Sequence, residues 1–126
     1  MNLALKRKVL VVEDNEQNLY LVTFLLESKG YEVIPARDGY IAIELFKTVD
    51  PDVVLLDIQL PGMDGFEVLS IIRDLPQFAQ IPVIAVTSHA MAGDRERMLK
   101  AGCTDYIEKP IDPVSFVSQI EKNLGS

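Results

Sequence analysis

Cysteine is almost missing from this chain, which has one, Cys103, among 126 residues. A single cysteine cannot form a disulfide within the chain, and we expect its thiol to be buried as a small apolar group rather than to be reactive. Histidine is equally scarce, since His89 stands alone. We assign His89 no chemistry beyond a modulating role, and the sequence has no Cys/His cluster that could hold zinc.

Positive charge is also in short supply. Lysine and arginine number 12 against 19 acidic residues, so the net charge is −7. Such a surface repels phosphate backbones, and we expect no direct nucleic-acid binding. No apolar run approaches the roughly 18 residues of a membrane span, and the start, MNLALKRK, does not have the order of a signal peptide. We therefore expect a soluble cytoplasmic protein.

What the chain does contain is a regular alternation of two kinds of segment. Short, β-branched apolar runs predict strands at 8–12, 31–35, 52–56, 82–86 and 105–109. Segments with helical spacing lie between them. Five strands alternating with five helices predict an α/β fold: a doubly wound, flavodoxin-like (βα)5 domain with a parallel sheet in the order 2-1-3-4-5. The more polar second and fifth strands should form the edges, and the length suits a single domain over 1–126 with its core at about 7–124.

Local signals mark the helix boundaries. Apolar positions at helical spacing predict two buried helix faces, formed by Ala42, Leu45, Phe46 and Val49 and by Val117, Ile120 and Leu124. Asn15, Asp38 and Asp112 (the last followed by Pro113) are predicted N-caps, and Gly30 and Gly102 predicted helix ends. The segment 89–102 predicts only a marginal helix, because it has few apolar residues and contains Gly93.

Polar residues follow the predicted strands at the edge where doubly wound sheets place their sites. Glu13 and Asp14 follow the first strand, Asp57 the third, Thr87 the fourth and Lys109 the fifth. The first and third strands are predicted neighbours, so these three carboxylates should converge. Two like charges 4 Å apart repel by about 4 kcal/mol at an effective dielectric of 20, which favours binding of a cation.

The donor set indicates the cation and the chemistry. Carboxylate oxygens, completed by a main-chain carbonyl and water, suit Mg²⁺. Lys109 adds a fixed positive charge and Thr87 a hydroxyl. A carboxylate nucleophile, a metal and positively charged donors are the equipment of phosphoryl transfer, and we expect Asp57 to accept the phosphoryl group.

Four motifs carry a family resemblance over nearly the whole chain. VLVVEDN, DVVLLDIQLPGMDGFEVL, IPVIAVTSHA and AGCTDYIEKPI resemble the receiver domain of bacterial two-component response regulators, the CheY-like superfamily. The motifs look closest to stand-alone receivers of the DivK kind and to receivers attached to hybrid kinases. The resemblance implies transfer of a phosphoryl group from a histidine kinase, or a histidine phosphotransfer protein, to an aspartate of the receiver.

The resemblance also implies a role for each matching residue. Asp57 is then the phosphoacceptor, Asp14 a direct metal ligand, and Glu13 the acid that holds the metal through water. The main-chain carbonyl of Gln59 would complete the metal site. The remaining roles fall to Thr87 as the mobile hydroxyl, Lys109 as the partner of the phosphoryl group, Tyr106 as the switch aromatic, and Lys109–Pro110 as a cis peptide bond.

Alternatives from other classes remain at this point. A flavin-binding module would need a hydroxyl- and glycine-rich loop where this chain has EDNEQN, and a phosphohydrolase would need a cap for which the length leaves no room. The chain could also be a receiver cut from a larger hybrid kinase or multidomain regulator. We expect a self-phosphorylating and self-dephosphorylating switch rather than a turnover enzyme.

The output of such a switch should leave through protein contacts. We expect a face formed by 89–124, carrying Met91, Arg95 and Met98, to contact a regulatory protein or a second copy of the chain.

Overall fold

The computed structural model describes residues 7–88 and 92–124, and in that part the five predicted strands form one parallel sheet in the order β2-β1-β3-β4-β5. The strands are β1 (Lys8–Val12), β2 (Glu32–Ala36), β3 (Val53–Asp57), β4 (Val83–Thr87) and β5 (Asp105–Glu108). The helices are α1 (Glu16–Glu27), α2 (Gly39–Phe46), α3 (Gly65–Asp74), α4 (Ala92–Lys100) and α5 (Phe116–Glu121), with a short 3₁₀ turn, η1 (Pro76–Phe78). The predicted fold class and strand order are confirmed.

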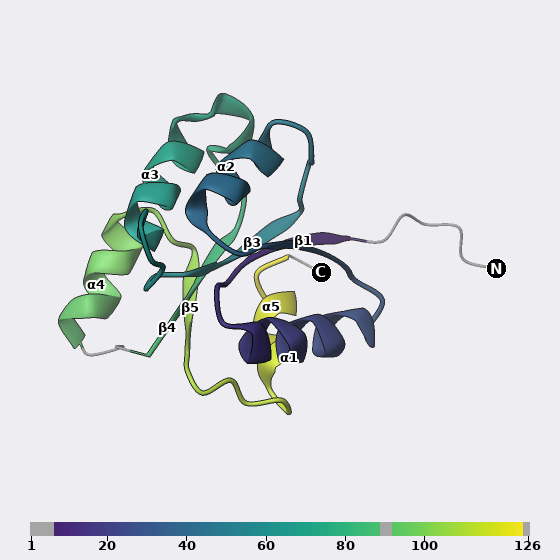
Figure 1. The fold of residues 1–126 in the computed structure, drawn as a ribbon. Helices are drawn as coiled ribbons and strands as arrows, with labels where there is room; N and C mark the ends of the chain where they lie inside the picture. Colours follow the sequence, from purple (N-terminus) through teal and green to yellow (C-terminus); the bar gives the residue numbers. More distant parts are fainter. Residues whose placement is uncertain (1–6, 89–91, 125–126) are drawn as a thin grey trace.

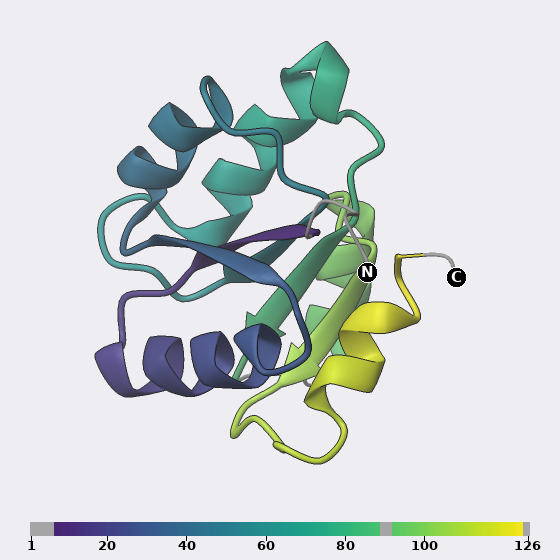
Figure 2. The same ribbon diagram turned by 90° about the vertical axis from the view of Figure 1, so that its right-hand side faces the viewer.

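Helices cover both faces of the sheet. α2, α3 and α4 lie on one face, and α1 and α5 on the other (Figures 1 and 2). Successive residues of a strand point to opposite faces, so β3 supplies both cores. Its Val54 and Leu56 pack beneath α2 and α3, whereas Val53 and Leu55 pack beneath α1 and α5. Every residue of β3 and β4 is buried, while β2 and β5, at the edges, are partly exposed as expected.

Several predicted helix boundaries are confirmed. Asn15 Oδ1 accepts a hydrogen bond from Asn18 N, and Asp38 Oδ1 from Ile41 N, as N-caps do. Gly30 and Gly102 follow α1 and α4 with φ of 91° and 113°, the left-handed region that glycine adopts without strain.

The predicted start of the last helix is wrong. α5 begins at Phe116, and its N-cap position is Ser115, so Asp112 and Pro113 lie before the helix. Asp112 still makes the contacts of a cap, one turn earlier: its side chain accepts hydrogen bonds from Val114 N and Ser115 Oγ, and its carbonyl accepts from Phe116 N at 3.0 Å.

Two further side chains of the predicted helix faces lie outside the helices. Val49 follows the end of α2, and Leu124 follows the end of α5. Both residues are half-buried, and Leu124 packs against the core beneath α1 and α5 from the turn that follows its helix.

The helix predicted to be marginal is present as α4, but one of its side chains does not lie where we expected. Met98 is 1% exposed and belongs to the core beneath α3, so it cannot contribute to a contact surface. Arg95 is exposed and its guanidinium lies 5.4 Å from the ring centre of Tyr106. His89 and Met91 lie outside the described residues.

Cys103 is buried, as expected, in the turn between α4 and β5. Burial raises the pKa of its thiol to about 11, so the reactive thiolate is scarce near neutral pH. Among the described residues, no helix combines the length and the apolar character needed to cross a membrane.

Arg73, at the end of α3, joins three turns on the opposite edge of the sheet from the predicted site. Its Nε and Nη2 donate to the carbonyl of Gly102 at 3.1 and 2.7 Å. Its Nη1 donates to the carbonyls of Phe78, Ala79 and Ile81 at 3.0, 3.3 and 2.7 Å. One half-buried guanidinium therefore satisfies carbonyls from η1, the turn before β4 and the turn before β5.

Candidate functional site

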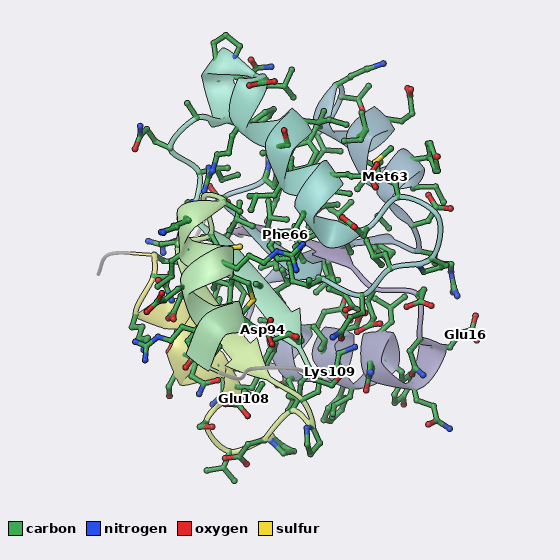
Figure 3. All side chains as sticks on the ribbon, turned by 90° about the vertical axis from the view of Figure 1, so that its left-hand side faces the viewer. Glu16, Met63, Phe66, Asp94, Glu108 and Lys109 are labelled. Carbon is green, nitrogen blue, oxygen red and sulfur yellow. The ribbon has the colours of Figure 1, made fainter. Side chains whose placement is uncertain are left out.

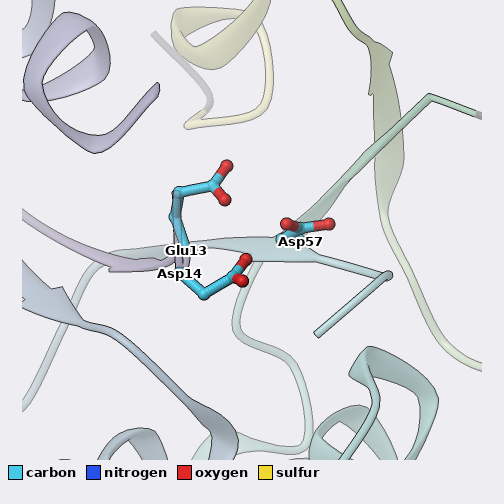
Figure 4. A group of neighbouring side chains, drawn as sticks. All are labelled: Glu13, Asp14 and Asp57. Carbon is cyan, nitrogen blue, oxygen red and sulfur yellow. The ribbon is translucent and has the colours of Figure 1, made fainter. Parts of the chain in front are cut away.

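The predicted site residues gather at the carboxyl edge of the sheet. Asp57 is the last residue of β3, and Glu13 and Asp14 directly follow β1, its neighbour in the sheet. Carboxylate oxygens of the three residues lie within 4.8 Å of one another. Figure 4 shows Glu13 and Asp14 extending from the same point of the chain toward Asp57. The sheet topology alone therefore brings three negative charges together.

Lys109 lies between two of these carboxylates. Its Nζ is 3.1 Å from Asp57 Oδ2 and 3.3 Å from Glu13 Oε1. It reaches the site from the turn that follows β5 (Figure 3). The Lys109–Pro110 peptide bond is cis, the form that the family resemblance implied. The Lys109 N–H donates to the carbonyl of Thr87 at 2.8 Å, which joins the ends of β4 and β5.

Burial governs the electrostatics of the site. Glu13 and Asp57 are 4% and 2% exposed, whereas Asp14 is exposed. Burial raises the pKa of Glu13 to about 7; the Asn15 N–H works against this, and the charge of Asp57 adds to it. The pKa of Lys109 is raised: burial lowers it, but the hydrogen bond and charge of Asp57, then those of Glu13, outweigh burial. The pair of buried acids thus favours an additional cation.

Main-chain N–H groups fix the second oxygen of each buried carboxylate. Gln59 N donates to Asp57 Oδ1 at 2.9 Å, and Asn15 N to Glu13 Oε2 at 3.1 Å. Each of these acids is held by one N–H group and by Lys109. They are therefore positioned before any ligand arrives.

Gly65, which the sequence analysis did not single out, allows the backbone to approach Asp57. A Cβ atom at this position would lie 2.7 Å from the Asp57 carbonyl oxygen and 2.6 Å from the Ile58 Cα. Only glycine permits α3 to start so close to the end of β3. The two glycines in PGMDG were the available signal, but a sequence does not show which of them has a backbone neighbour.

Thr87 and Ser88 border the site on the β4 side. Thr87 is 1% exposed and is the last residue of β4, next to the end of β3. The side-chain amide of Gln59 contacts both residues: Nε2 lies 3.4 Å from Thr87 Oγ1, and Oε1 accepts from Ser88 N and Oγ at 3.3 and 3.1 Å. The sequence analysis assigned Gln59 only a main-chain role, and nothing in the sequence indicates this bridge.

Tyr106 is separate from the carboxylates. It lies on β5, half-buried against the core beneath α3 and α4, with Arg95 over its ring. The structure thus brings together Glu13, Asp14, Asp57 and Lys109, with Thr87 beside them, and places Tyr106 one strand further out.

Comparison with known proteins decides the family. The profile of the response regulator receiver domain matches residues 9–121. The chain belongs to this family. It is 45% identical over 119 residues to the polar-differentiation response regulator DivK of Brucella ovis, covering 94% of this chain and 97% of DivK. This match favours a DivK-like response regulator over a domain of a larger hybrid kinase, and a receiver over the flavin and phosphohydrolase alternatives.

Solved structures agree with this assignment. The chemotaxis protein CheY4 of Vibrio cholerae superposes with a TM-score of 0.90 at 27% identity, over 94% of this chain and 99% of that one. The receiver domain of the sensor histidine kinase PA1611 of Pseudomonas aeruginosa, solved with magnesium in its active-site cleft, gives 0.88 at 34% identity over 97% and 100%.

The residues present here fit a magnesium ion. The three carboxylates supply hard oxygen ligands close enough together to share one cation, and the exposed side of Asp14 leaves a route from solvent. Glu13, Asp14 and Asp57, with the main-chain carbonyl of Gln59, are the residues that would hold it. Receiver domains bind Mg²⁺ in an acidic pocket of this kind.

Proposed function

We propose that this receiver domain accepts a phosphoryl group on Asp57, in a reaction that requires Mg²⁺ bound by Glu13, Asp14, Asp57 and the Gln59 carbonyl. The observation that supports this most directly is Lys109, whose Nζ contacts Asp57 and Glu13 within a cluster of three carboxylates. A structural ion pair needs two charged groups, whereas this site has four, one of which is the exposed Asp14.

The chain's own residues perform the positioning. A carboxylate oxygen of Asp57 forms a bond to phosphorus as the bond between phosphorus and the donor's leaving group breaks, and the leaving group departs with the electron pair. Lys109 stays within reach of the transferred oxygens, and the Gln59 N–H holds the acceptor carboxylate in place. Mg²⁺ held by these residues would supply positive charge that stabilises the negative charge of the phosphoryl oxygens.

The donor is a sensor histidine kinase or a histidine phosphotransfer protein. The product stays attached to the chain, so the protein is a switch that phosphorylates and dephosphorylates itself and not a turnover enzyme. A negative surface and a protein donor both agree with a cytoplasmic location and with an output through protein contacts rather than DNA or membrane.

A small phosphodonor tests the proposal without knowledge of the kinase. The chain is incubated with acetyl phosphate in Mg²⁺ or in EDTA and its intact mass is measured. We expect one added phosphoryl group, only with Mg²⁺, and peptide mapping should place it on Asp57. Phosphorylation of another residue, or equal phosphorylation in EDTA, would contradict the assignment.

The switch itself involves Thr87 and Tyr106. The phosphoryl group adds roughly −1.5 to −2 charge and three acceptor oxygens, to which Thr87 donates after a short movement. That movement frees space beside β4, and Tyr106, half-buried on the neighbouring strand, enters it. Moving the equilibrium between the two conformations from 1:99 to 99:1 takes about 5.5 kcal/mol. One hydrogen bond to a charged group contributes only about 1.5–3 kcal/mol, so Lys109 and the repacked Tyr106 ring must contribute as well.

Thr87→Ala should separate phosphorylation from the switch. We expect phosphorylation of Asp57 to continue, because Lys109 and the Gln59 N–H still hold its carboxylate, while the conformational response weakens. Amide NMR shifts of residues 92–108 on activation are the measurement, and Thr48→Ala, at an exposed threonine in the turn after α2, is the control. Equal shifts in Thr87→Ala and the wild type would disprove this coupling.

The output face lies over α4, β5 and α5, within the predicted 89–124. A groove of about 360 Å³ runs along it, lined among others by Arg95, Tyr106 and Lys122. Met98 is buried and is not part of this face. We therefore propose that Arg95 and Tyr106 make the contacts with the partner. Calorimetric titration of candidate partners, or of a second copy, should show affinity that depends on loading Asp57 with a phosphoryl mimic.

A further inference from the structure

The side chain of Gln59 connects the loop after β3 to the end of β4. Its Oε1 accepts hydrogen bonds from Ser88 N at 3.3 Å and Ser88 Oγ at 3.1 Å, and its Nε2 donates to Thr87 Oγ1 at 3.4 Å. The main-chain N–H of Gln59 meanwhile donates to Asp57 Oδ1. One residue thus holds the acceptor through its main chain and the end of β4 through its side chain.

One of these contacts occupies a donor that a phosphoryl group on Asp57 would need, the Ser88 N–H, and another fixes the Thr87 hydroxyl oxygen. Asp57 is the register partner of Val86, so Thr87, the last residue of β4, and Ser88, which follows it, come next along the chain at this edge. The Thr87 hydroxyl and the Ser88 N–H are therefore placed to donate to a phosphoryl group on Asp57. The carboxamide oxygen of Gln59 already accepts from the Ser88 N–H, so it stands where an oxygen of the phosphoryl group would otherwise bind.

A second position for the carboxamide exists nearby. A cavity of about 310 Å³ between α3, α4 and the site is lined by Gln59 and Thr87 on one side and by Phe66, Asp94 and Arg97 on the other. The Arg97 guanidinium lies 4.2 Å from the ring centre of Phe66. Figure 3 shows Phe66 of α3 and Asp94 of α4 on the same side of the molecule as Lys109. Arg97 offers donors and Asp94 an acceptor to a displaced amide.

We infer that the Gln59 carboxamide is a latch that holds Thr87 and Ser88 in the unphosphorylated arrangement and must be displaced when Asp57 is phosphorylated. This inference rests on the proposed function of Asp57. A ligand shifts a two-state equilibrium only through its difference in affinity for the two states. Removing contacts made only in the unphosphorylated state therefore favours the phosphorylated one, by about five-fold for one neutral hydrogen bond.

The test uses beryllium fluoride with Mg²⁺ as the phosphoryl mimic and measures its dissociation constant by amide NMR. Gln59→Ala should bind the mimic about five-fold more tightly than the wild type. Gln59→Glu should bind it more weakly, because its oxygens keep the Ser88 contacts and add a negative charge. Ser88→Ala should tighten binding less than Gln59→Ala does, and the double variant should bind no more tightly than Gln59→Ala alone.

A second readout in the free protein separates a latch from a general structural role. Amide hydrogen exchange of Ser88 should accelerate in Gln59→Ala, while exchange in β1 and β3 stays unchanged. The latch alone would be overturned if Gln59→Ala bound the mimic no more tightly than the wild type does. It would also be overturned if the effects of Gln59→Ala and Ser88→Ala on the dissociation constant were additive in the double variant. If the wild type did not bind the mimic, or if Asp57→Asn bound it equally well, the proposed function and the latch would be overturned together.

Discussion

Asp57→Asn is expected to abolish phosphorylation by acetyl phosphate in the presence of Mg²⁺. The asparagine keeps the shape of the side chain but offers a neutral amide in place of the anionic oxygen that attacks phosphorus. It also removes a negative charge from the proposed metal site and from the ion pair with Lys109, whose Nζ retains Glu13. The loss should exceed about 100-fold, since no weaker nucleophile occupies the same position.

Intact-mass spectrometry over a time course measures this effect. Asp52→Asn is the matched control, because it makes the same isosteric change just before the other end of β3, where Asp52 accepts a hydrogen bond from Lys8 N. The control should be phosphorylated like the wild type. Equal phosphorylation of Asp57→Asn, without a new acceptor, would show that another residue carries the chemistry.

Arg73→Ala should cause the largest loss of stability among the substitutions considered. Arg73 donates to four carbonyls, those of Phe78, Ala79, Ile81 and Gly102. Hydrogen bonds from a charged donor each contribute about 1.5–3 kcal/mol net, and these carbonyls would have to find water in half-buried turns. We expect the free energy of unfolding to fall by about 3 kcal/mol.

Urea unfolding followed by circular dichroism gives this free energy, provided that the slope of the transition is unchanged. Arg73→Lys should recover less than half of the loss, because one ammonium group cannot reach the carbonyls on both sides. Arg37→Ala is the control: Arg37 pairs with Glu16 on the exposed surface, and its loss should cost less than about 1 kcal/mol. Similar stabilities of Arg73→Ala and Arg37→Ala would contradict the assigned role.

Most residues of the site could be predicted from the sequence, because the order of the strands in the sheet determines where they lie. Apolar runs located the strands to within one residue, and the rule for parallel sheets then placed the residues after β1, β3, β4 and β5 at one edge. Asp57 and Thr87 prove to be the final residues of their strands rather than the residues after them. Their side chains still reach the edge, so the shift did not affect the prediction.

The predictions from sequence failed where a side chain has more than one possible partner or position. Asp112 before a proline is a sound N-cap pattern, but here its carboxylate binds Val114 N and Ser115 Oγ within a turn. Met98 is one apolar side chain in a polar helix, and no local pattern shows that it points inward. The contacts of Gln59 with Thr87 and Ser88, and of Arg73 with Gly102, join residues 28 or 29 positions apart, a distance in sequence that local patterns do not cover.

The alternation of β3 between two cores limits how this chain can change in length. Val53 and Leu55 belong to one core, Val54 and Leu56 to the other, and Asp57 completes the same alternation. Inserting or deleting one residue within the strand would exchange the two sets and turn Asp57 to the wrong face. Descendants of this gene can therefore vary the strand by substitution, while gains and losses of residues are confined to exposed turns such as the one at Lys47 and Thr48.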